Sequence, residues 1–161
     1  MRIADRFALL FGPGAWPAFG SGPRKGRNGL NGPGMPLFLH GRGDFPFDAV
    51  ALPRHRADLR VLAATRRWTG PRYDCAATLI LTDGKAYEKN RVAVEIDGVM
   101  IGYCPSYLAT RFREWMQRWH FLQAHVQCKA IIVREGVGTD GEPARLRVKL
   151  DIELPFKVTR L

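Results

Sequence analysis

The sequence contains little of what membrane proteins and disulfide-bonded proteins need. It has only three cysteines, Cys75, Cys104 and Cys128, and this odd number without a CxxC pair indicates free thiols in a reducing environment. No segment approaches the roughly 18 consecutive apolar residues that a membrane-spanning helix requires. Asp5 and Arg6 interrupt the apolar N-terminal stretch, which therefore makes a poor signal peptide. We expect a cytoplasmic protein without a membrane partner.

Familiar catalytic and metal-binding motifs are also missing. The four histidines show no HExxH spacing, and the sequence has neither a GxSxG turn nor a Walker phosphate loop. His125 and Cys128 lie three residues apart in a segment with strand alternation, so they should point to opposite faces and cannot share a metal ion. The scattered carboxylates show no metal-site spacing, and we interpret them as surface residues. We therefore expect a protein that is not an enzyme and that binds neither a metal nor a cofactor.

Acidic residues are few relative to basic ones, with 15 Asp and Glu against 25 Lys and Arg, and the net charge is +10. Folding does not need such an excess, which usually indicates an anionic partner and most often a nucleic acid. A basic surface without a specific partner is the alternative that composition leaves open. The apolar fraction of 46% allows a chain of 161 residues to bury the core of one domain.

Glycine, proline and basic residues are concentrated near the N-terminus. Residues 1–43 hold 10 of the 17 glycines, 5 of the 11 prolines, and six Lys or Arg against a single Asp. A segment of this composition buries too little apolar surface to offset the entropy lost on ordering. We therefore predict a basic, Gly/Pro-rich flexible tail over residues 1–43 and a folded domain over residues 44–161. The segment MPLFLHG within the tail resists this interpretation, because it could form an edge strand or pack on the domain.

From residue 45 onward the hydrophobic pattern becomes regular and predicts the fold. Alternation predicts strands within residues 45–52, 73–82, 92–96, 99–103, 125–135 and 144–156, and helical spacing predicts helices within 56–68 and 106–119. Asp97-Gly98 is typical of a two-residue hairpin turn. The order β-α-β-β-β-α-β-β contains no βαβ unit, which favours a mostly β (α+β) fold: a small antiparallel, partly closed barrel of the OB/SH3-like kind with two short helices. Nine residues in the inward phase should share one core: Leu79, Val92, Val94, Ile101, Leu108, Phe112, Ile132, Val148 and Leu150.

The loop at residues 85–90 combines side chains that suit the end of a nucleic-acid strand. Tyr87 offers a ring on which a base can stack, worth roughly 1–3 kcal/mol per base in single-strand binders. Glu88 can accept a hydrogen bond from a sugar hydroxyl, and Lys85, Lys89 and Asn90 supply two cations and an amide beside it. Alternatively, Tyr87 packs under the barrel and Asn90 only shapes the turn.

This loop and the strands around it resemble the HIRAN domain, a module of helicase-like translocases that remodel stalled replication forks, also found as small bacterial and phage proteins. The family signature is approximately N-P-Y-D-x-N-A-[VI]-x-V, and residues 85–94 read KAYEKNRVAV. A second element, x-[ND]-G-x-x-[VI]-G-[YH]-[LI], is similar to DGVMIGYC at residues 97–104. The resemblance covers about residues 45–157. It implies a stand-alone HIRAN-like domain that binds single-stranded DNA at a free 3′-hydroxyl end without catalysing a reaction.

The resemblance also implies roles for individual residues. Carried over by position, base stacking falls on Tyr87 and the contact to the terminal hydroxyl falls on Glu88. Tyr103 is expected to face DNA, and Arg54 and His55, which follow the first strand, are expected to supply further contacts. DNA is favoured over RNA, with a protein partner in DNA processing as an additional expectation.

The chain also departs from the signature. Lys85-Ala86 stands in place of Asn-Pro, which replaces a rigid proline and an amide by a cation and a flexible residue. Glu88 stands in place of Asp and is one methylene longer. An alternative function therefore stays open, a protein-interaction or adaptor domain that keeps the HIRAN-like barrel without binding DNA ends.

Overall fold

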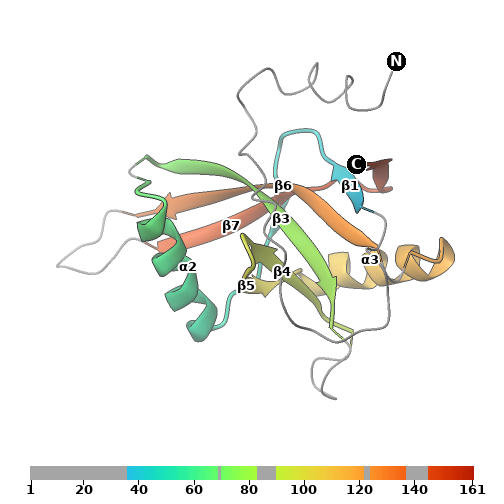
Figure 1. Ribbon diagram of the computed structural model, residues 1–161, viewed down its shortest axis with the longest axis horizontal. Coiled ribbons are helices and arrows are strands. Elements are labelled where there is room, and N and C mark those ends of the chain that lie inside the picture. Colours follow the sequence, from blue (N-terminus) through green and yellow to red (C-terminus); the bar gives the residue numbers. More distant parts are fainter. Residues whose placement is uncertain (1–35, 69, 83–89, 122–123, 137–144) are drawn as a thin grey trace.

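The computed structural model describes residues 36–68, 70–82, 90–121, 124–136 and 145–161. Within these residues the protein is mostly β, with two helices that lie towards opposite ends of the molecule in Figure 1. The elements in chain order are β1 (Pro36–His40), β2 (Phe47–Asp48), α2 (Pro53–Thr65), β3 (Arg72–Leu81), β4 (Val92–Ile96), β5 (Val99–Tyr103), α3 (Ser106–Arg118), β6 (His125–Glu135), β7 (Arg145–Asp151) and β8 (Lys157–Arg160).

A single curled sheet contains all the strands of the described residues. Its main path runs β2-β7-β6-β3-β4-β5, and every neighbouring pair along this path is antiparallel. Strand β1 lies off this path, where it pairs in parallel with β6 and antiparallel with β8. The predicted order β-α-β-β-β-α-β-β is confirmed for β2 through β7, and β1 and β8 extend it at either end.

The two ends of the sheet path meet at one short contact. Val50, which follows β2, donates its N–H to the carbonyl oxygen of Tyr103 at 2.7 Å, and Tyr103 donates its N–H to the carbonyl of Val50 at 2.9 Å. A Cβ on Gly102 would lie only 2.6 Å from the Val50 oxygen, so this approach requires glycine at position 102. We call this contact between Val50 and Tyr103 the seam, and it makes the sheet a partly closed barrel.

Residues 36–43, which the sequence placed in the flexible tail, belong to the folded domain. Leu37, Phe38 and Leu39 are at most 1% exposed, because β1 lies between β6 and β8. Beyond β1, the N–H of Gly43 donates to the buried carboxylate of Asp151 at 2.9 Å. Of the two interpretations left open for MPLFLHG, a strand is the one the structure shows, since three consecutive apolar side chains are buried there despite the Gly/Pro-rich context. Residues 1–35 of the predicted tail lie outside the described residues.

The predicted core is confirmed, because all nine residues are buried in one hydrophobic cluster. On α3, Phe112 faces the core as predicted and is fully buried, whereas the neighbouring Arg111 is exposed. The helix was predicted within residues 106–119, but it ends at Arg118, and Trp119 beyond it is 58% exposed. The Asp97-Gly98 turn has the expected positive φ at both residues, 52° and 81°.

The segment 45–52 forms a much shorter strand than its alternation predicts. Only Phe47–Asp48 pairs as β2, and Val50 adds an isolated bridge at the seam. Phe45 has a φ of 48°, a left-handed conformation that a strand does not allow. Its buried ring nevertheless lies against the Arg72 guanidinium, with 4.9 Å between the carbon of the cation and the ring centroid.

Replacing Gly102 by alanine should open the seam. The added methyl group has no room beside the Val50 carbonyl, so we expect Gly102→Ala to lower the free energy of unfolding by about 1–3 kcal/mol or more. Gly70→Ala is the matched control, because its Cβ would meet only ordinary contacts at 3.4 Å and beyond, and it should change stability by less than about 0.5 kcal/mol. Urea unfolding followed by circular dichroism measures both. Equal stabilities of the two variants would contradict the close approach at the seam.

Candidate functional site

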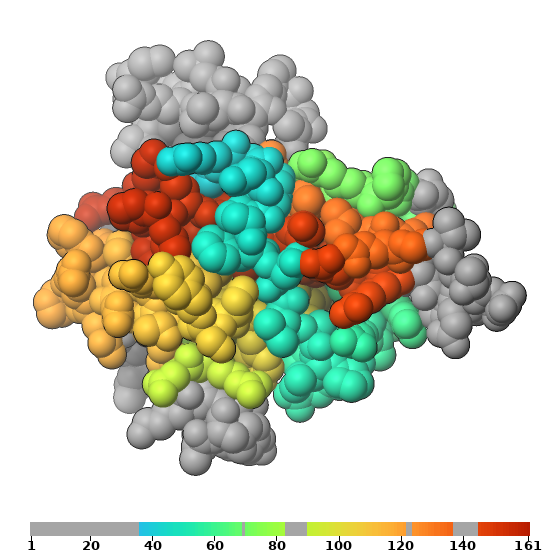
Figure 2. Space-filling view, turned by 180° about the vertical axis from the view of Figure 1, so that it is seen from behind, coloured from blue at the N-terminus to red at the C-terminus, as the bar shows by residue number. Residues whose placement is uncertain are grey.

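The seam opens into a cavity of about 320 Å³, which we call the seam cavity. The exit of β2, the residues before β4, the end of β5 and the first turns of α3 all contribute to its walls. On the face shown in Figure 2, the segment after β2, in cyan, meets the segment between β5 and α3, in yellow. The lining residues are Val50, Leu52, Asn90, Arg91, Tyr103, Cys104, Ser106, Ala109 and Thr110.

Three residues that the resemblance implied for the site lie in direct contact beside the seam: Arg54, His55 and Tyr103. The rings of His55 and Tyr103 meet edge to face with 5.5 Å between their centroids. One guanidinium nitrogen of Arg54 lies 3.5 Å from the Tyr103 hydroxyl, and its Nε lies 3.2 Å from Nε2 of His55. The barrel closure therefore brings together three of the eight predicted site residues.

The start of α2 explains why His55 points inward. Pro53 occupies the first turn of the helix, a position where its missing N–H costs nothing. His55 then accepts the backbone N–H of Leu52 at Nδ1, at 3.2 Å, as the glutamate or glutamine of a capping box would do. A neutral imidazole accepts at only one nitrogen, so this bond to the fixed backbone places the ring proton on Nε2. The Nε of the exposed Arg54 is then a close neighbour of Nε2 rather than a hydrogen-bond donor to it.

Tyr103 acts as a support for cations and is not an open surface for a base. It is only 4% exposed, and the guanidinium carbon of Arg91 lies 4.8 Å from its ring centroid. Arg91 covers the ring in a cation–π contact, while Arg54 reaches the hydroxyl. The Tyr103 ring is thus covered by Arg91, and its hydroxyl contacts Arg54.

Arg91 is a site residue that the sequence reasoning missed. It lines the seam cavity and contacts Tyr103 through its guanidinium. The signal for it was present, since Arg91 stands where the family signature has alanine and is therefore a cation added to the motif. Asn90 lies beside it on the cavity wall with a φ of 78°, a left-handed conformation that asparagine tolerates.

Arg113 on α3 fastens the base of the loop that carries the other predicted residues. Its guanidinium donates to the carbonyl oxygens of Thr82 at 2.9 Å and Arg91 at 2.8 Å. The Thr82 hydroxyl also donates to the Arg91 carbonyl at 2.9 Å. The chain therefore leaves the sheet after Thr82 and returns at Arg91 with both points held to the same helix. Lys85, Tyr87, Glu88 and Lys89 fall in the intervening segment and lie outside the described residues.

The described part of the chain contains neither a cluster of metal-binding side chains nor an exposed thiol. No group of three or more His, Cys, Asp or Glu residues within it is arranged to hold a metal ion. The three cysteines are free and buried, and burial raises the pKa of the Cys104 thiol to about 12, which keeps it protonated. Neither helix of the described residues has the length and apolar character needed to cross a bilayer.

No protein-family model, curated protein or solved structure matches the chain. The interpretation of the site therefore depends on its own residues, which are two arginines supported by an aromatic ring, an asparagine and the start of a helix around one cavity.

Loss of the Arg113 hydrogen bonds should destabilise the domain. Arg113→Met keeps most of the aliphatic chain and removes both bonds to carbonyl oxygens, so we expect it to lower the free energy of unfolding by about 1.5–3 kcal/mol. Arg111→Met is the control, since Arg111 is exposed on the same helix, and it should cost less than about 0.5 kcal/mol. Urea unfolding measures both changes. Equal costs would show that the Arg113 bonds contribute nothing to stability.

The buried His55 and the partly buried His40 should make stability fall in mildly acidic solution. Burial, and next the positive charge of Arg54, lower the pKa of His55 below its usual 6.5, while Asp58 opposes this shift. Burial also lowers the pKa of His40. Below pH 6.5 these histidines therefore bind protons more readily in the unfolded chain than in the folded one. The free energy of unfolding should then decline as the pH falls below 6.5, by up to about 1.4 kcal/mol per pH unit for each group.

His55→Gln isolates the contribution of that side chain. Glutamine can still accept the N–H of Leu52 but does not titrate, so the decline in unfolding free energy below pH 6.5 should become shallower, with the part due to His40 remaining. Urea unfolding at a series of pH values between 5 and 8 supplies the comparison. A profile for His55→Gln parallel to that of the wild type would contradict the lowered pKa.

Proposed function

We propose that the protein is a non-catalytic, HIRAN-like nucleic-acid-binding module that holds a free end of single-stranded DNA. The observation that supports this most is the gathering of Arg54, His55, Asn90 and Tyr103 around one seam, together with the additional cation of Arg91. These residues come from three segments, at 54–55, 90–91 and 103, and the resemblance had pointed to four of them.

The charges of the seam cavity suit an anion. Arg91 lines the cavity, and none of its lining residues is acidic. Ser106, at the start of α3, is also in the wall, and the first backbone N–H groups of a helix favour negative charge. A volume of about 320 Å³ is at the lower end of the range for ligand pockets, which fits a terminal nucleotide better than a duplex.

The partners of the arginines support the same proposal. Arg42, Arg66, Arg72 and Arg147 each form an ion pair with a carboxylate. By contrast, among the described residues Arg54 and Arg91 contact only neutral rings and a hydroxyl. A guanidinium held by a neutral partner keeps its charge available for phosphate, whereas a carboxylate would already have neutralised it.

Within this proposal the loop and the seam have different tasks. Tyr87 stacks on the terminal base and Glu88 accepts the hydrogen bond of the 3′-hydroxyl, as the resemblance implies. Lys85 and Lys89 add positive charge to the loop. Arg54 and Arg91 neutralise the phosphates that follow the terminal nucleotide.

A protein-interaction or adaptor domain is the second candidate, because two apolar side chains flank the seam. Val50 is 52% exposed and Leu52 is 37% exposed, and both line the seam cavity. A protein partner would bury this pair, whereas a nucleic acid would be held mainly by the cations. Titration of the wild type with single strands separates the two, since the adaptor hypothesis expects no binding.

The loop residues should contribute separable terms to binding. Tyr87→Ala removes a stacking face and should weaken binding to any single strand by roughly 1–3 kcal/mol. Glu88→Gln keeps the size but loses the charge that strengthens the bond from a hydroxyl, so it should cost about 1–2 kcal/mol with 3′-hydroxyl strands only. A 3′-phosphate should bind the wild type more weakly, and Glu88→Gln should recover part of that loss. Fluorescence anisotropy with matched 3′-hydroxyl and 3′-phosphate strands measures all three.

Asp74→Asn is the control for removal of one negative charge. Asp74 pairs with Arg72 on β3, seven residues before the end of that strand and therefore about 23 Å along it from the loop. This variant should bind both kinds of end as the wild type does. Equal wild-type affinity for 3′-hydroxyl and 3′-phosphate ends, unchanged by Glu88→Gln, would leave Glu88 as a surface carboxylate and the protein as a general basic binder.

A further inference from the structure

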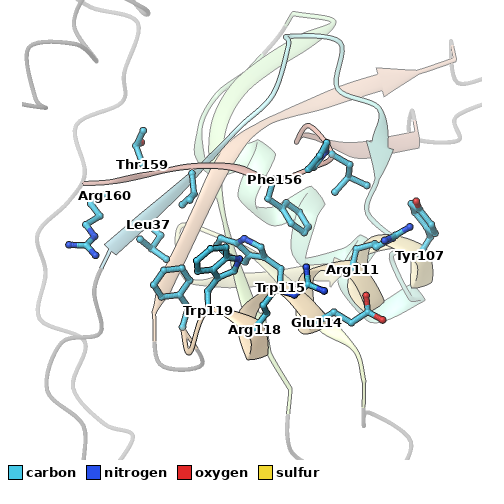
Figure 3. Close-up of a pocket in the computed structure, with 14 residues that line it drawn as sticks. Leu37, Tyr107, Arg111, Glu114, Trp115, Arg118, Trp119, Phe156, Thr159 and Arg160 are labelled. Atoms are coloured by element: carbon cyan, nitrogen blue, oxygen red, sulfur yellow. The ribbon is translucent and has the colours of Figure 1, made fainter.

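A second and larger hollow lies between α3 and the C-terminal segment. These two parts of the chain lie side by side on the face shown in Figure 2, where α3 is gold and the C-terminal segment red. The hollow has a volume of about 880 Å³, and we call it the aromatic groove. Its lining residues are Leu37, Tyr107, Arg111, Glu114, Trp115, Arg118, Trp119, Phe121, Leu154, Pro155, Phe156, Val158, Thr159 and Arg160 (Figure 3).

The aromatic side chains form a packed floor with exposed rings beside it. Trp115 lies with its ring centroid 5.3 Å from that of Phe156 and 5.4 Å from that of Phe121. Trp119 and Tyr107, in contrast, are 58% and 61% exposed. Exposed rings of this kind provide the faces on which single-stranded bases stack.

The charged side chains of the groove are mostly arginines. Arg111, Arg118 and Arg160 line it against the single carboxylate of Glu114. Figure 3 shows Arg111 beside Tyr107 towards one end, and the guanidinium carbon of Arg111 lies 5.4 Å from the Tyr107 ring centroid. Within the described ranges none of these three arginines is in an ion pair. The groove therefore combines stacking surfaces with available positive charge.

The outer face of α3 connects this groove with the seam cavity. A shallow hollow along the helix is lined by Ser106, Tyr107, Thr110, Arg111 and Glu114. Ser106 and Thr110 also line the seam cavity, and the other three residues also line the aromatic groove. The three hollows thus adjoin one another along the outer face of the helix, whose 13 residues correspond to about 20 Å of axial length.

We propose that the aromatic groove is the continuation of a track for single-stranded nucleic acid that begins at the seam cavity. A strand whose end enters the seam cavity runs along α3, its bases stack on Tyr107 and Trp119, and its phosphates face Arg111, Arg118 and Arg160. Glu114, between them, can accept a hydrogen bond from a base amino group. This proposal rests on the proposed function and extends it from a terminal nucleotide to a longer binding site.

The charge of the groove favours a nucleic-acid strand as its occupant over the N-terminal part of the chain itself. Residues 1–35 hold five Lys or Arg and a single Asp, so the arginines of the groove would repel them. A polyanion gains from every one of these cations. The groove therefore fits a nucleic-acid strand in both shape and sign of charge.

Binding as a function of strand length tests the track. We would measure anisotropy with a labelled 3′-hydroxyl dodecanucleotide and determine the affinity of an unlabelled dinucleotide by competition. Trp119→Ala should weaken binding of the dodecanucleotide by roughly tenfold or more and leave the affinity for the dinucleotide unchanged, because only the longer strand reaches the groove. Trp119→Phe keeps a ring and should restore most of the affinity. Since Trp119 is exposed, neither change should disturb the core.

Charge variants complete the test. Arg118→Gln should weaken binding of the dodecanucleotide. It should also reduce the magnitude of the slope of log affinity against log salt concentration by about one. Arg60→Gln, which removes the same charge from the exposed face of α2, should leave that slope unchanged. Arg91→Gln should weaken strands of both lengths, because both occupy the seam cavity.

Two results would overturn the track while leaving the proposed function intact. In the first, the wild type binds the dodecanucleotide no more tightly than the dinucleotide. In the second, Trp119→Ala and Arg118→Gln change the affinity for the dodecanucleotide no more than the control Arg60→Gln does. Failure of the wild type to bind strands of either length would instead overturn the proposed function, and the track with it.

Discussion

The two hydrogen bonds between Val50 and Tyr103 are the contact on which the candidate site depends. They join the exit of β2 to the end of β5, and Gly102 supplies the space that this approach needs. The chain enters α2 directly after the first of these residues and α3 directly after the second. One local constraint therefore sets the positions of both helix starts, of Arg54 and His55 on α2, and of the cavity between them.

The arginines of the described residues differ in their partners, and several that lie away from the seam, such as Arg134 over the Trp68 ring, are also outside the ion pairs. Arg66 at the end of α2 and Arg147 on β7 are in ion pairs with carboxylates, which use up their charge. Arg54 and Arg91 contact Tyr103 instead, and Arg111 contacts Tyr107. These contacts of Arg54, Arg91 and Arg111 lie along the seam and α3, which are the parts of the molecule that both proposals concern.

Sequence patterns predicted the elements whose burial is periodic, because alternation and helical spacing record which face of each element meets the core. They could not place β1, since its three consecutive buried apolar residues have no period and its neighbours are glycine and proline, and they did not predict β8 as a separate strand. The end of α3, and with it the exposure of Trp119, depends on where the chain turns towards β6. For the site, the motif pointed to Arg54, His55, Asn90 and Tyr103, but the burial of the Tyr103 ring under Arg91 arises from the barrel closure, which no local pattern encodes.

The most direct test of the account is an amide NMR titration of the intact chain with a single strand that has a free 3′-hydroxyl. The account predicts that shifts concentrate on the amides of Val50, Asn90, Arg91 and Tyr103 and on the first turns of α3, and that the amides of β7 and of the last turn of α2 stay unchanged. Shifts that spread evenly over all basic surfaces would contradict a defined site at the seam. An unchanged spectrum at saturating strand concentration would contradict nucleic-acid binding altogether.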